Sequence, residues 1–332
     1  MARTRGVCLM AVMIENGYSL PTPTYARIGW RDVISSASAT SAAPDGAAVN
    51  ALSWQTYERW RPTASPATLT LTFDAQMVEY IAAGAHTLST ADSVTLQVRS
   101  GSAWSTVTTD LIEWPLDNEA IMVLIEPREI NGVRLNITYS GDAPSVGKVA
   151  AGKVLTLRRP FYSGYSPAML SRNTRRQPSV SEGGEWLGNT VIRQSRSARM
   201  TWQHIEANWY RINVDPFVQH ARGNPFFVAW NPARFTDCLY GMLTGDVSPS
   251  NMGIRDLMEF SIDVDAYSDG TQPWLSKYTP AWIEIYPDIE DQASIIDLAL
   301  NREWPLDIDP AIIAPFADRI AQTVNYGLFT GQ

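Results

Sequence analysis

The run Ala67-Thr68-Leu69-Thr70-Leu71-Thr72-Phe73 alternates apolar and polar residues at every step. Successive side chains of a β-strand point to opposite faces, so Leu69, Leu71 and Phe73 would share one face and the threonines the other. A strand of this kind buries one face and exposes the other to water, as in antiparallel sheets. The run therefore predicts one strand of a layered β fold.

Strand patterns continue on the C-terminal side of this run. Four further segments have strand character, namely Val78–Ala83, Val94–Arg99, Ile121–Glu126 and Val133–Tyr139. The breaks between them fall at Gly84, Gly101, Asn118 and Asn131-Gly132. No long helical pattern lies among these strands, which favours a β-sandwich or jelly roll over residues 25–158. Residues 1–24 are predicted to form an N-terminal strand or arm.

A second module is predicted over residues 190–268. Glu206–Arg222 has helical spacing of its apolar residues and ends at Gly223-Asn224-Pro225, while Pro216 could divide this helix into two pieces. The strand candidates around the helix are Ser197–His204, Phe226–Trp230, Cys238–Thr244 and Leu257–Tyr267. The order β-α-β-β-β predicts a small α+β unit, a sheet with one helix across it.

Two other segments complete the predicted architecture. Residues 159–189 lack periodicity and contain several prolines and glycines, so we expect an extended connecting segment. Residues 269–332 are expected to hold two short amphipathic docking helices, Ile289–Leu300 and Asp309–Tyr326. The predicted fold class is therefore mainly β: a jelly-roll sandwich, a small α+β core and two C-terminal helices.

Composition and charge exclude several classes of function. The 332-residue chain has a net charge of −8, which disfavours a general binder of the nucleic-acid backbone. No apolar stretch approaches the ~20 residues needed to span a membrane, so no membrane insertion is expected. Cys8 and Cys238 are the only cysteines, too few for a disulfide framework or a cysteine-rich metal site.

Catalytic motifs are absent from the sequence. The three histidines, His86, His204 and His220, do not accompany a Gly-x-Ser-x-Gly turn, and no phosphate loop or dinucleotide glycine pattern occurs. His86 could touch a ligand or be a hydrogen-bonded turn residue. His204-Ile205-Glu206 resembles a metal pair but lacks a third ligand, which favours a capping or packing role. We therefore expect no catalytic residue, no metal, no cofactor and no enzyme activity.

The strongest chemical signal is aromatic, because the chain contains 12 Trp and 13 Tyr. Trp54, Tyr57, Trp60 and Trp104 fall at or near predicted loops of the jelly roll. An exposed indole can stack on the apolar face of a sugar ring while polar groups bind the hydroxyls. These four residues are the candidate carbohydrate-binding set. The alternative is that Trp54 and Trp60 close the open end of the sandwich.

Two family resemblances sharpen this interpretation, and the first concerns residues 25–139. The motifs are Asn50-Ala51-Leu52-Ser53-Trp54 with Arg59-Trp60-Arg61-Pro62, the run Ala67–Phe73, and Gly84-Ala85-His86-Thr87-Leu88. This pattern resembles the discoidin-like, galactose-binding-type jelly roll of phage tail proteins. The resemblance implies either carbohydrate binding or a spacer that decorates a structural ring.

The second resemblance covers about residues 190–267. Its motifs are Arg199–Trp202, a helix carrying Trp209, Asn224–Trp230, Leu239–Gly245 and Met258–Val264. This pattern resembles the core of phage distal tail and related tail-tip proteins. The chain departs from the simplest distal tail layout, because the jelly roll precedes this core and two helices follow it.

Together the resemblances imply a structural protein of a long-tailed phage tail tip or baseplate, which forms a ring through subunit contacts and presents the jelly roll for attachment or fibre docking. Its expected partners are other copies of itself in a cyclic trimer or hexamer, neighbouring tail proteins, and a host surface glycan bound by the jelly roll. The expected location is the virion, after assembly in the host cytoplasm. The competing hypothesis is a carbohydrate-binding accessory module of a carbohydrate-active enzyme, which an acidic pair in a deep aromatic cleft would favour.

Overall fold

A computed structural model describes residues 12–108, 118–161, 171, 173–253 and 255–268 of the chain. These residues belong to one compact unit of the chain. The predicted docking helices, Ile289–Leu300 and Asp309–Tyr326, lie outside the described residues, as does the whole predicted segment 269–332. Among the described residues, no helix has the length and apolar character that crossing a membrane requires.

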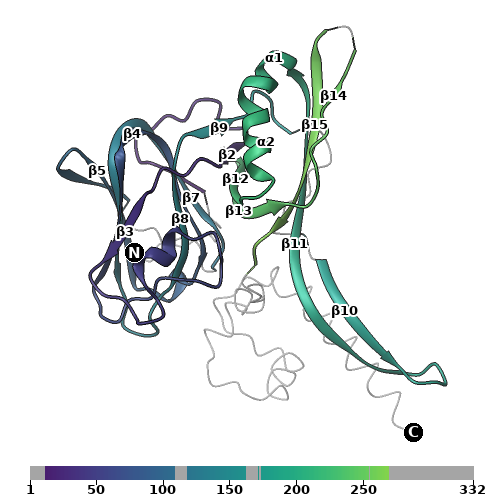
Figure 1. The fold of residues 1–332 in the computed structure, drawn as a ribbon, viewed down its shortest axis with the longest axis horizontal. Helices are drawn as coiled ribbons and strands as arrows, with labels where there is room; N and C mark the ends of the chain where they lie inside the picture. The colour runs from purple at the N-terminus through teal and green to yellow at the C-terminus, as the bar shows by residue number, and fades with distance from the viewer. Residues whose placement is uncertain (1–11, 109–117, 162–170, 172, 254, 269–332) are drawn as a thin grey trace, which may run out of the picture. The chain divides into compact units, whose positions relative to one another are not determined.

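The first sheet has seven strands and is ordered β3-β4-β7-β5-β6, with β1 on β7 and β8 on β4 (Figure 1). The strands are β1 (Val12–Ile14), β3 (Ser36–Ala39), β4 (Ala67–His86), β5 (Ser93–Ser100), β6 (Ala103–Thr108), β7 (Ile121–Thr138) and β8 (Val146–Gly152). Two short 3-10 helices, η1 (Ala48–Leu52) and η2 (Leu88–Thr90), interrupt the loops. All neighbours pair antiparallel except β1, which runs parallel to β7.

Strands β4 and β7 are long enough to serve both layers of a sandwich. Their register shifts between Thr72 and Gln76, where residues 74–77 are exposed. The N-terminal half of β4 pairs with β3, and its C-terminal half pairs with β8. Both halves contribute to one apolar core that contains Leu69, Leu71 and Ile81. The alternation read from residues 67–73 is therefore confirmed, with all three predicted apolar positions buried.

The second sheet has eight strands and is ordered β10-β11-β15-β13-β12-β2-β9, with β14 on β15. The strands are β2 (Arg27–Gly29), β9 (Val154–Thr156), β10 (Asn173–Val180), β11 (Trp186–Glu206), β12 (Phe226–Asn231), β13 (Phe235–Leu243), β14 (Ser250–Asn251) and β15 (Leu257–Ala266). β2 and β9 come from the two ends of the segment predicted as the jelly roll. They reach this sheet because β2 pairs with both β12 and β9.

One helical segment packs against this sheet, as the sequence predicts. It consists of α1 (Ala207–Trp209), the π-helical turn η3 (Tyr210–Val214) and α2 (Asp215–Ala221). Pro216 occupies the first turn of α2, where its missing N–H is tolerated, so the helical segment continues through the π turn and the predicted division at Pro216 does not occur. Phe217 is fully buried and lies in the second apolar core with Trp202 and Phe226. The mainly-β fold class, with a sandwich and one helix across a second sheet, is confirmed.

Two local predictions need correction. Gly84 and Asn131-Gly132 do not end strands but lie inside β4 and β7. At Gly84, an added Cβ would lie 2.9 Å from Cδ1 of Tyr240 and 3.2 Å from Cε1 of Phe227, so this glycine allows rings from the second sheet to approach. Those two rings belong to a third core that also includes Tyr80 of β4.

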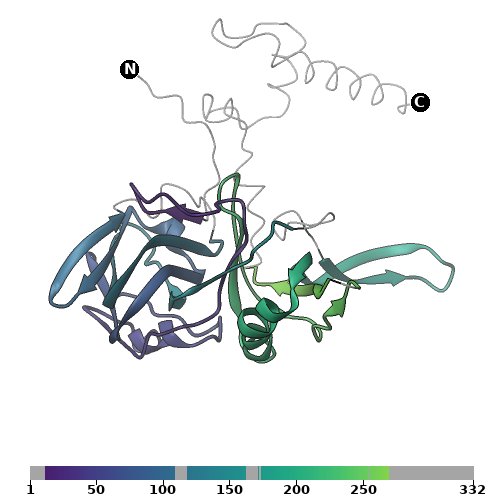
Figure 2. The same ribbon diagram turned by 90° about the horizontal axis from the view of Figure 1, so that it is seen from above.

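The predicted connecting segment 159–189 also differs from expectation. It contains β10 and the start of β11, which form an antiparallel hairpin that extends past the rest of the sheet (Figures 1 and 2). The sequence lacks apolar alternation here because both faces of the ribbon are exposed. Pro178 is tolerated because β10 is the edge strand of its sheet.

Candidate functional site

A pocket of about 420 Å³ lies where the loop Trp54–Tyr57 meets strands β13 and β15. Its lining residues come from distant parts of the chain: Trp54, Gln55, Thr56, Tyr57, Ser195, Pro225, Tyr240, Gly241, Met242, Asp265, Ala266, Tyr267 and Ser268. The set combines aromatic rings with hydroxyl, amide and carboxylate groups, and the described lining residues include no lysine or arginine. Sites for small polar ligands have this composition of apolar walls and a few polar groups.

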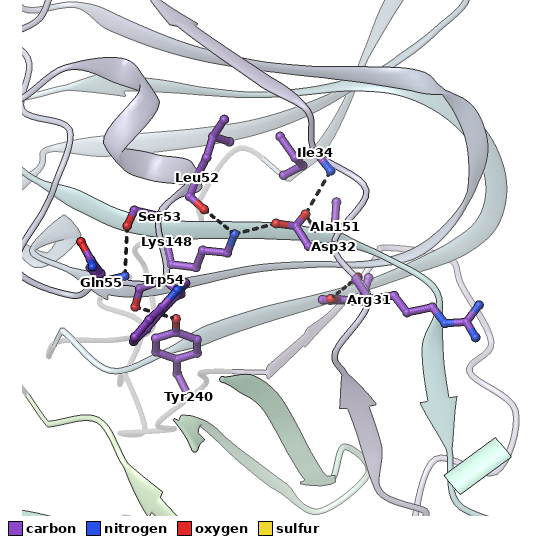
Figure 3. Close-up of polar contacts among 11 residues, drawn as sticks. Arg31, Asp32, Ile34, Leu52, Ser53, Trp54, Gln55, Lys148, Ala151 and Tyr240 are labelled. Atoms are coloured by element: carbon purple, nitrogen blue, oxygen red, sulfur yellow. Dashed lines mark hydrogen bonds and ion pairs between the residues drawn. The ribbon is translucent and has the colours of Figure 1, made fainter. Parts of the chain in front are cut away.

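The loop is fixed at its start by the ion pair of Lys148 and Asp32 (Figure 3). Lys148 Nζ on β8 donates a 2.6 Å hydrogen bond to Asp32 Oδ2 and a 2.8 Å hydrogen bond to the carbonyl of Leu52. The side chains of Lys148 and Asp32 are 12% and 25% exposed, so water screens this pair less than a surface pair. Asp32 Oδ1 in turn accepts a hydrogen bond from the backbone N–H of Ile34 at 3.1 Å.

The middle of the loop is held from the second sheet. The hydroxyl of Tyr240 on β13 donates to the carbonyl of Trp54 at 3.3 Å, as Figure 3 shows. Burial, and to a smaller degree the charge of Asp32, raise the pKa of Tyr240 well above its usual value. The phenol therefore stays protonated and remains a donor. The backbone N–H of Gln55 also donates to Ser53 Oγ at 3.2 Å, which closes a tight turn before the rings.

Arg59 fixes the far end of the loop. Its Nε donates to the carbonyl of Thr56 at 3.0 Å, and its Nη2 donates to the hydroxyl of Tyr267 at 2.6 Å. The Tyr57 hydroxyl donates to Gln55 Oε1 at 3.0 Å. With three anchors over a few residues, the loop is pre-organised, which lowers the entropy cost of binding a ligand.

Two of the four predicted carbohydrate-binding residues meet at this pocket. Trp54 is 47% exposed and Tyr57 is 77% exposed, although both are large and partly apolar. Exposed rings beside polar groups can stack on a sugar ring while hydroxyls and carboxylates bind its OH groups. The structure thus brings Trp54 and Tyr57 together, next to Asp265 and Tyr267, which the sequence did not single out.

The other two predicted residues lie elsewhere. Trp60 is 0% exposed and packs in the first apolar core, its backbone forms an isolated β-bridge with Val146, and its Nε1 donates to the carbonyl of Ser41 at 3.0 Å. Its assignment as a sugar-stacking residue is wrong, and the alternative of a residue that closes the sandwich fits its burial. Trp104 lies on β6 at the outer face of the first sheet, between Arg99 and Arg134, and does not line the pocket.

Sequence reasoning missed the residues that the second sheet contributes. Tyr240 and Asp265 belong to predicted strands, but no local signal distinguishes them from other strand residues. Strand β13 pairs with β15 so that Met242 lies opposite Asp265, and this register brings both to one wall of the pocket. Only the packing of the two sheets makes them neighbours of Trp54.

His86 and His220 pack within the fold, whereas His204 is exposed where the register of β11 shifts. His86 is buried, and its Nδ1 accepts a 3.3 Å hydrogen bond from the backbone N–H of Leu88, as expected of a turn residue. His220 packs against the ring of Trp30 at 5.2 Å, and burial lowers its pKa. Within the described ranges, no group of three or more His, Cys, Asp or Glu side chains is close enough to bind a metal ion.

Comparisons with known proteins found similar solved structures but no matching protein family. No protein-family model matches the chain. No curated protein matches it either. Chitosan-binding module 1 from a chitosanase/glucanase of Paenibacillus sp. IK-5 is similar at a TM-score of 0.33 and 20% identity, over 37% of this chain and 99% of that one.

A family 32 carbohydrate-binding module of Clostridium perfringens NanJ, solved with galactose, is similar at a TM-score of 0.32 and 16% identity, over 38% of this chain and 98% of the module. The family 32 module of AlyQ, solved with 4,5-unsaturated mannuronic acid, is similar at a TM-score of 0.31 and 14% identity, over 36% of this chain and 94% of the module. Likenesses at these scores do not bear on what the present chain binds.

Proposed function

We propose that the chain is a saccharide-binding protein that holds a sugar in the pocket between the loop Trp54–Tyr57 and strands β13 and β15. One observation carries this proposal: Trp54 and Tyr57 are exposed together at a pocket that also presents a carboxylate and several hydroxyl groups. Two large aromatic side chains exposed at one pocket offer a surface that a ligand can cover. A sugar ring suits them because one face is apolar and its edge carries hydroxyls.

The expected affinity of a single pocket is low. Stacking one sugar ring on an indole contributes on the order of 1–2 kcal/mol, at about 25 cal/mol per Å² of apolar area. After the cost of association, one site would bind near the millimolar range. Attachment to a polysaccharide or a cell surface would then depend on several copies acting together, because multivalency raises avidity ~10²–10⁴-fold.

The test is binding of the full chain to an array of neutral and cell-surface glycans, followed by titration of the best ligand. Trp54→Ala and Tyr57→Ala should each weaken binding about tenfold, because each removes a stacking surface. Ile212→Ala is the control, since Ile212 is 63% exposed on the helical segment and does not line the pocket. Near-ultraviolet circular dichroism checks that each variant is folded.

Two results would contradict the proposal. The first is a wild-type chain that binds no glycan on the array. The second is a pair of folded variants, Trp54→Ala and Tyr57→Ala, that bind as tightly as the wild type.

The β10–β11 hairpin favours a second candidate function, that of a structural subunit. Large apolar side chains are exposed along both of its strands, namely Val180, Trp186, Leu187, Val191 and Ile192. A two-stranded ribbon is only marginally stable in water, so a neighbouring surface is needed to cover it. In this proposal, copies of the chain associate through the hairpin into a cyclic trimer or hexamer, each contact burying more than about 1,000 Å².

Such a subunit would fit the tail-tip role that the sequence resemblance implies, in a virion assembled in the host cytoplasm beside other tail proteins. Light scattering on the purified chain should give the mass of a trimer or hexamer. The double variant Trp186→Ser/Ile192→Ser should shift the mass towards a monomer, whereas Trp54→Ser/Tyr57→Ser should not. A wild-type chain that stays monomeric at high concentration would exclude this role for the hairpin.

A further inference from the structure

A second group of aromatic and charged side chains lies on the outer face of the first sheet. The guanidinium carbons of Arg134 and Arg99 lie 4.3 Å and 5.4 Å from the ring centroid of Trp104. Trp104 belongs to β6, where it pairs with Arg99 of β5, and Arg99 pairs with Gly132 of β7. An added Cβ on Gly132 would lie 3.3 Å from Cη2 of the indole, so the ring reaches across β5 to the position that a side chain would fill.

Neutral groups hold both guanidinium groups in place. Arg99 Nε donates to Asn131 Oδ1 at 3.0 Å, and its Nη2 donates to the carbonyl of the same residue at 3.2 Å. Arg134 Nε donates to Gln97 Oε1 at 2.5 Å, and that oxygen also accepts from Asn136 Nδ2 at 2.9 Å. These bonds fix the orientation of the two cations without cancelling their charge.

The charge of this cluster is available to a ligand. Neither Arg99 nor Arg134 forms an ion pair within the described part of the chain. The two terminal amino groups of Arg134 make no hydrogen bond to the described residues, and they are not among the buried polar atoms without partners, so solvent reaches them. Such a planar fork of donors matches the two oxygens of a carboxylate or the oxygens of a sulfate.

The surrounding sheet face is rich in small polar groups. Strand register places hydroxyl and amide side chains beside the two arginines: Ser36, Ser38, Thr68, Thr70, Thr72, Thr95, Gln97, Thr106 and Asn136. Their cross-strand hydrogen bonds, such as Ser36 Oγ to Thr72 Oγ1 at 2.6 Å and Gln97 Nε2 to Thr106 Oγ1 at 3.0 Å, show that they share this face. Hydroxyl and amide groups suit the hydroxyls of an extended polysaccharide.

We propose that this face is a second glycan site, which binds a carboxylate- or sulfate-bearing polysaccharide. Arg134 and Arg99 hold the acidic group, and Trp104 positions both guanidinium groups while the polar side chains contact the sugar hydroxyls. A nucleic acid fits less well, because the chain carries a net charge of −8 and this cluster provides only two cations. The site is separate from the pocket at Trp54, whose described lining residues include no cation.

The proposal is tested by titrating the full chain with polygalacturonate, dextran sulfate and uncharged dextran. The wild type should bind at least one acidic polymer more tightly than dextran. Raising the salt from about 0.1 M to about 1 M should weaken this binding, because the screening length falls from ~10 Å to ~3 Å. Preference for polygalacturonate would identify a carboxylate ligand, and preference for dextran sulfate a sulfate ligand.

Variants assign the binding to this face. Arg134→Gln should weaken acidic-polymer binding about tenfold, as expected for loss of a charge-assisted hydrogen-bonding group, and Arg99→Gln/Arg134→Gln should abolish it. Arg134→Lys keeps the positive charge but removes the planar fork of donors, so the affinity for the acidic polymer should fall less than in Arg134→Gln. This graded loss of affinity indicates direct ligand contact rather than misfolding. Arg222→Gln is the matched control for charge, because Arg222 is exposed at the end of α2.

The two glycan sites can fail independently. Trp54→Ala should leave the affinity for acidic polymers unchanged, and the arginine variants should leave the affinity of the Trp54 pocket for its sugar unchanged. The proposal is overturned if the folded double arginine variant binds acidic polymers like the wild type. It is equally overturned if the wild type binds neither acidic polymer, or if single-stranded DNA of matched charge competes as well as they do.

Discussion

The hydroxyl of Tyr240 donates a hydrogen bond of 3.3 Å to the carbonyl of Trp54, a residue 186 positions earlier in the chain. This bond links strand β13 of the second sheet to the loop that carries the exposed rings. Together with Lys148 and Arg59, it explains how a loop without secondary structure can present Trp54 and Tyr57 in a fixed arrangement.

Removing the Tyr240 hydroxyl should affect both stability and binding. Tyr240→Phe leaves the carbonyl of Trp54 without this donor, so the free energy of unfolding should fall by about 1 kcal/mol. Glycan affinity should fall as well, because the loop is less ordered before binding. Chemical denaturation and glycan titration measure the two effects. Tyr57→Phe serves as the control for stability, since its hydrogen bond to Gln55 is exposed; equal losses in both variants would refute the special role of Tyr240.

Lys148 is expected to matter more than an ordinary surface lysine. Lys148→Met removes the cation from the partly buried Asp32 and the donor from the carbonyl of Leu52, so we expect a loss of about 2 kcal/mol in unfolding free energy. Arg61→Met breaks the ion pair with Asp45, in which both side chains are well exposed, and should cost about 0.5 kcal/mol or less. Thermal and chemical unfolding provide the comparison, and a smaller loss for Lys148→Met than for Arg61→Met would contradict the prediction.

Gly84 is predicted to be intolerant of any side chain. Gly84→Ala places a Cβ 2.9 Å from the ring of Tyr240, so either the ring or strand β4 must shift, at a cost of about 1–3 kcal/mol. Gly223→Ala is the control, because no atom lies within 4 Å of its added Cβ, and its effect should stay within about 0.5 kcal/mol. The prediction fails if the two variants unfold at the same denaturant concentration.

Stability should depend on pH through His220. Burial lowers the pKa of His220 from 6.5, so the unfolded chain takes up a proton at a higher pH than the folded chain does. The unfolded state then binds more protons, and stability decreases as the pH falls below 6.5 towards the lower folded pKa. His220→Gln should flatten this part of the profile without changing glycan binding. Unfolding curves from neutral to mildly acidic pH test this, and an unchanged slope in the variant would rule it out.

Much of the fold follows from local pattern. Alternation over residues 67–73 predicts a half-buried strand, and helical spacing over Glu206–Arg222 predicts the helix that crosses the second sheet. The β10–β11 hairpin escaped prediction because neither of its faces is buried in the described structure, so no apolar alternation marks it. The local sequence predicts strand ends at Gly84 and Gly132, but both lie inside strands, because a glycine that admits a neighbouring ring has the same local sequence pattern as a turn glycine.

In the candidate sites, too, the sequence determined some features and the tertiary structure decided others. The sequence by itself determined that the chain is mainly β, rich in aromatic residues, and equipped with Trp54 and Tyr57 in a loop, because these properties depend on residues close together in the chain. Only the tertiary structure decided that Trp60 is buried against Val146, and that Arg99 and Arg134 flank Trp104. It also decided that Tyr240 and Asp265 complete the pocket at Trp54. The physical reason is that burial and pairing depend on strand register and sheet packing, which join residues that no local pattern connects.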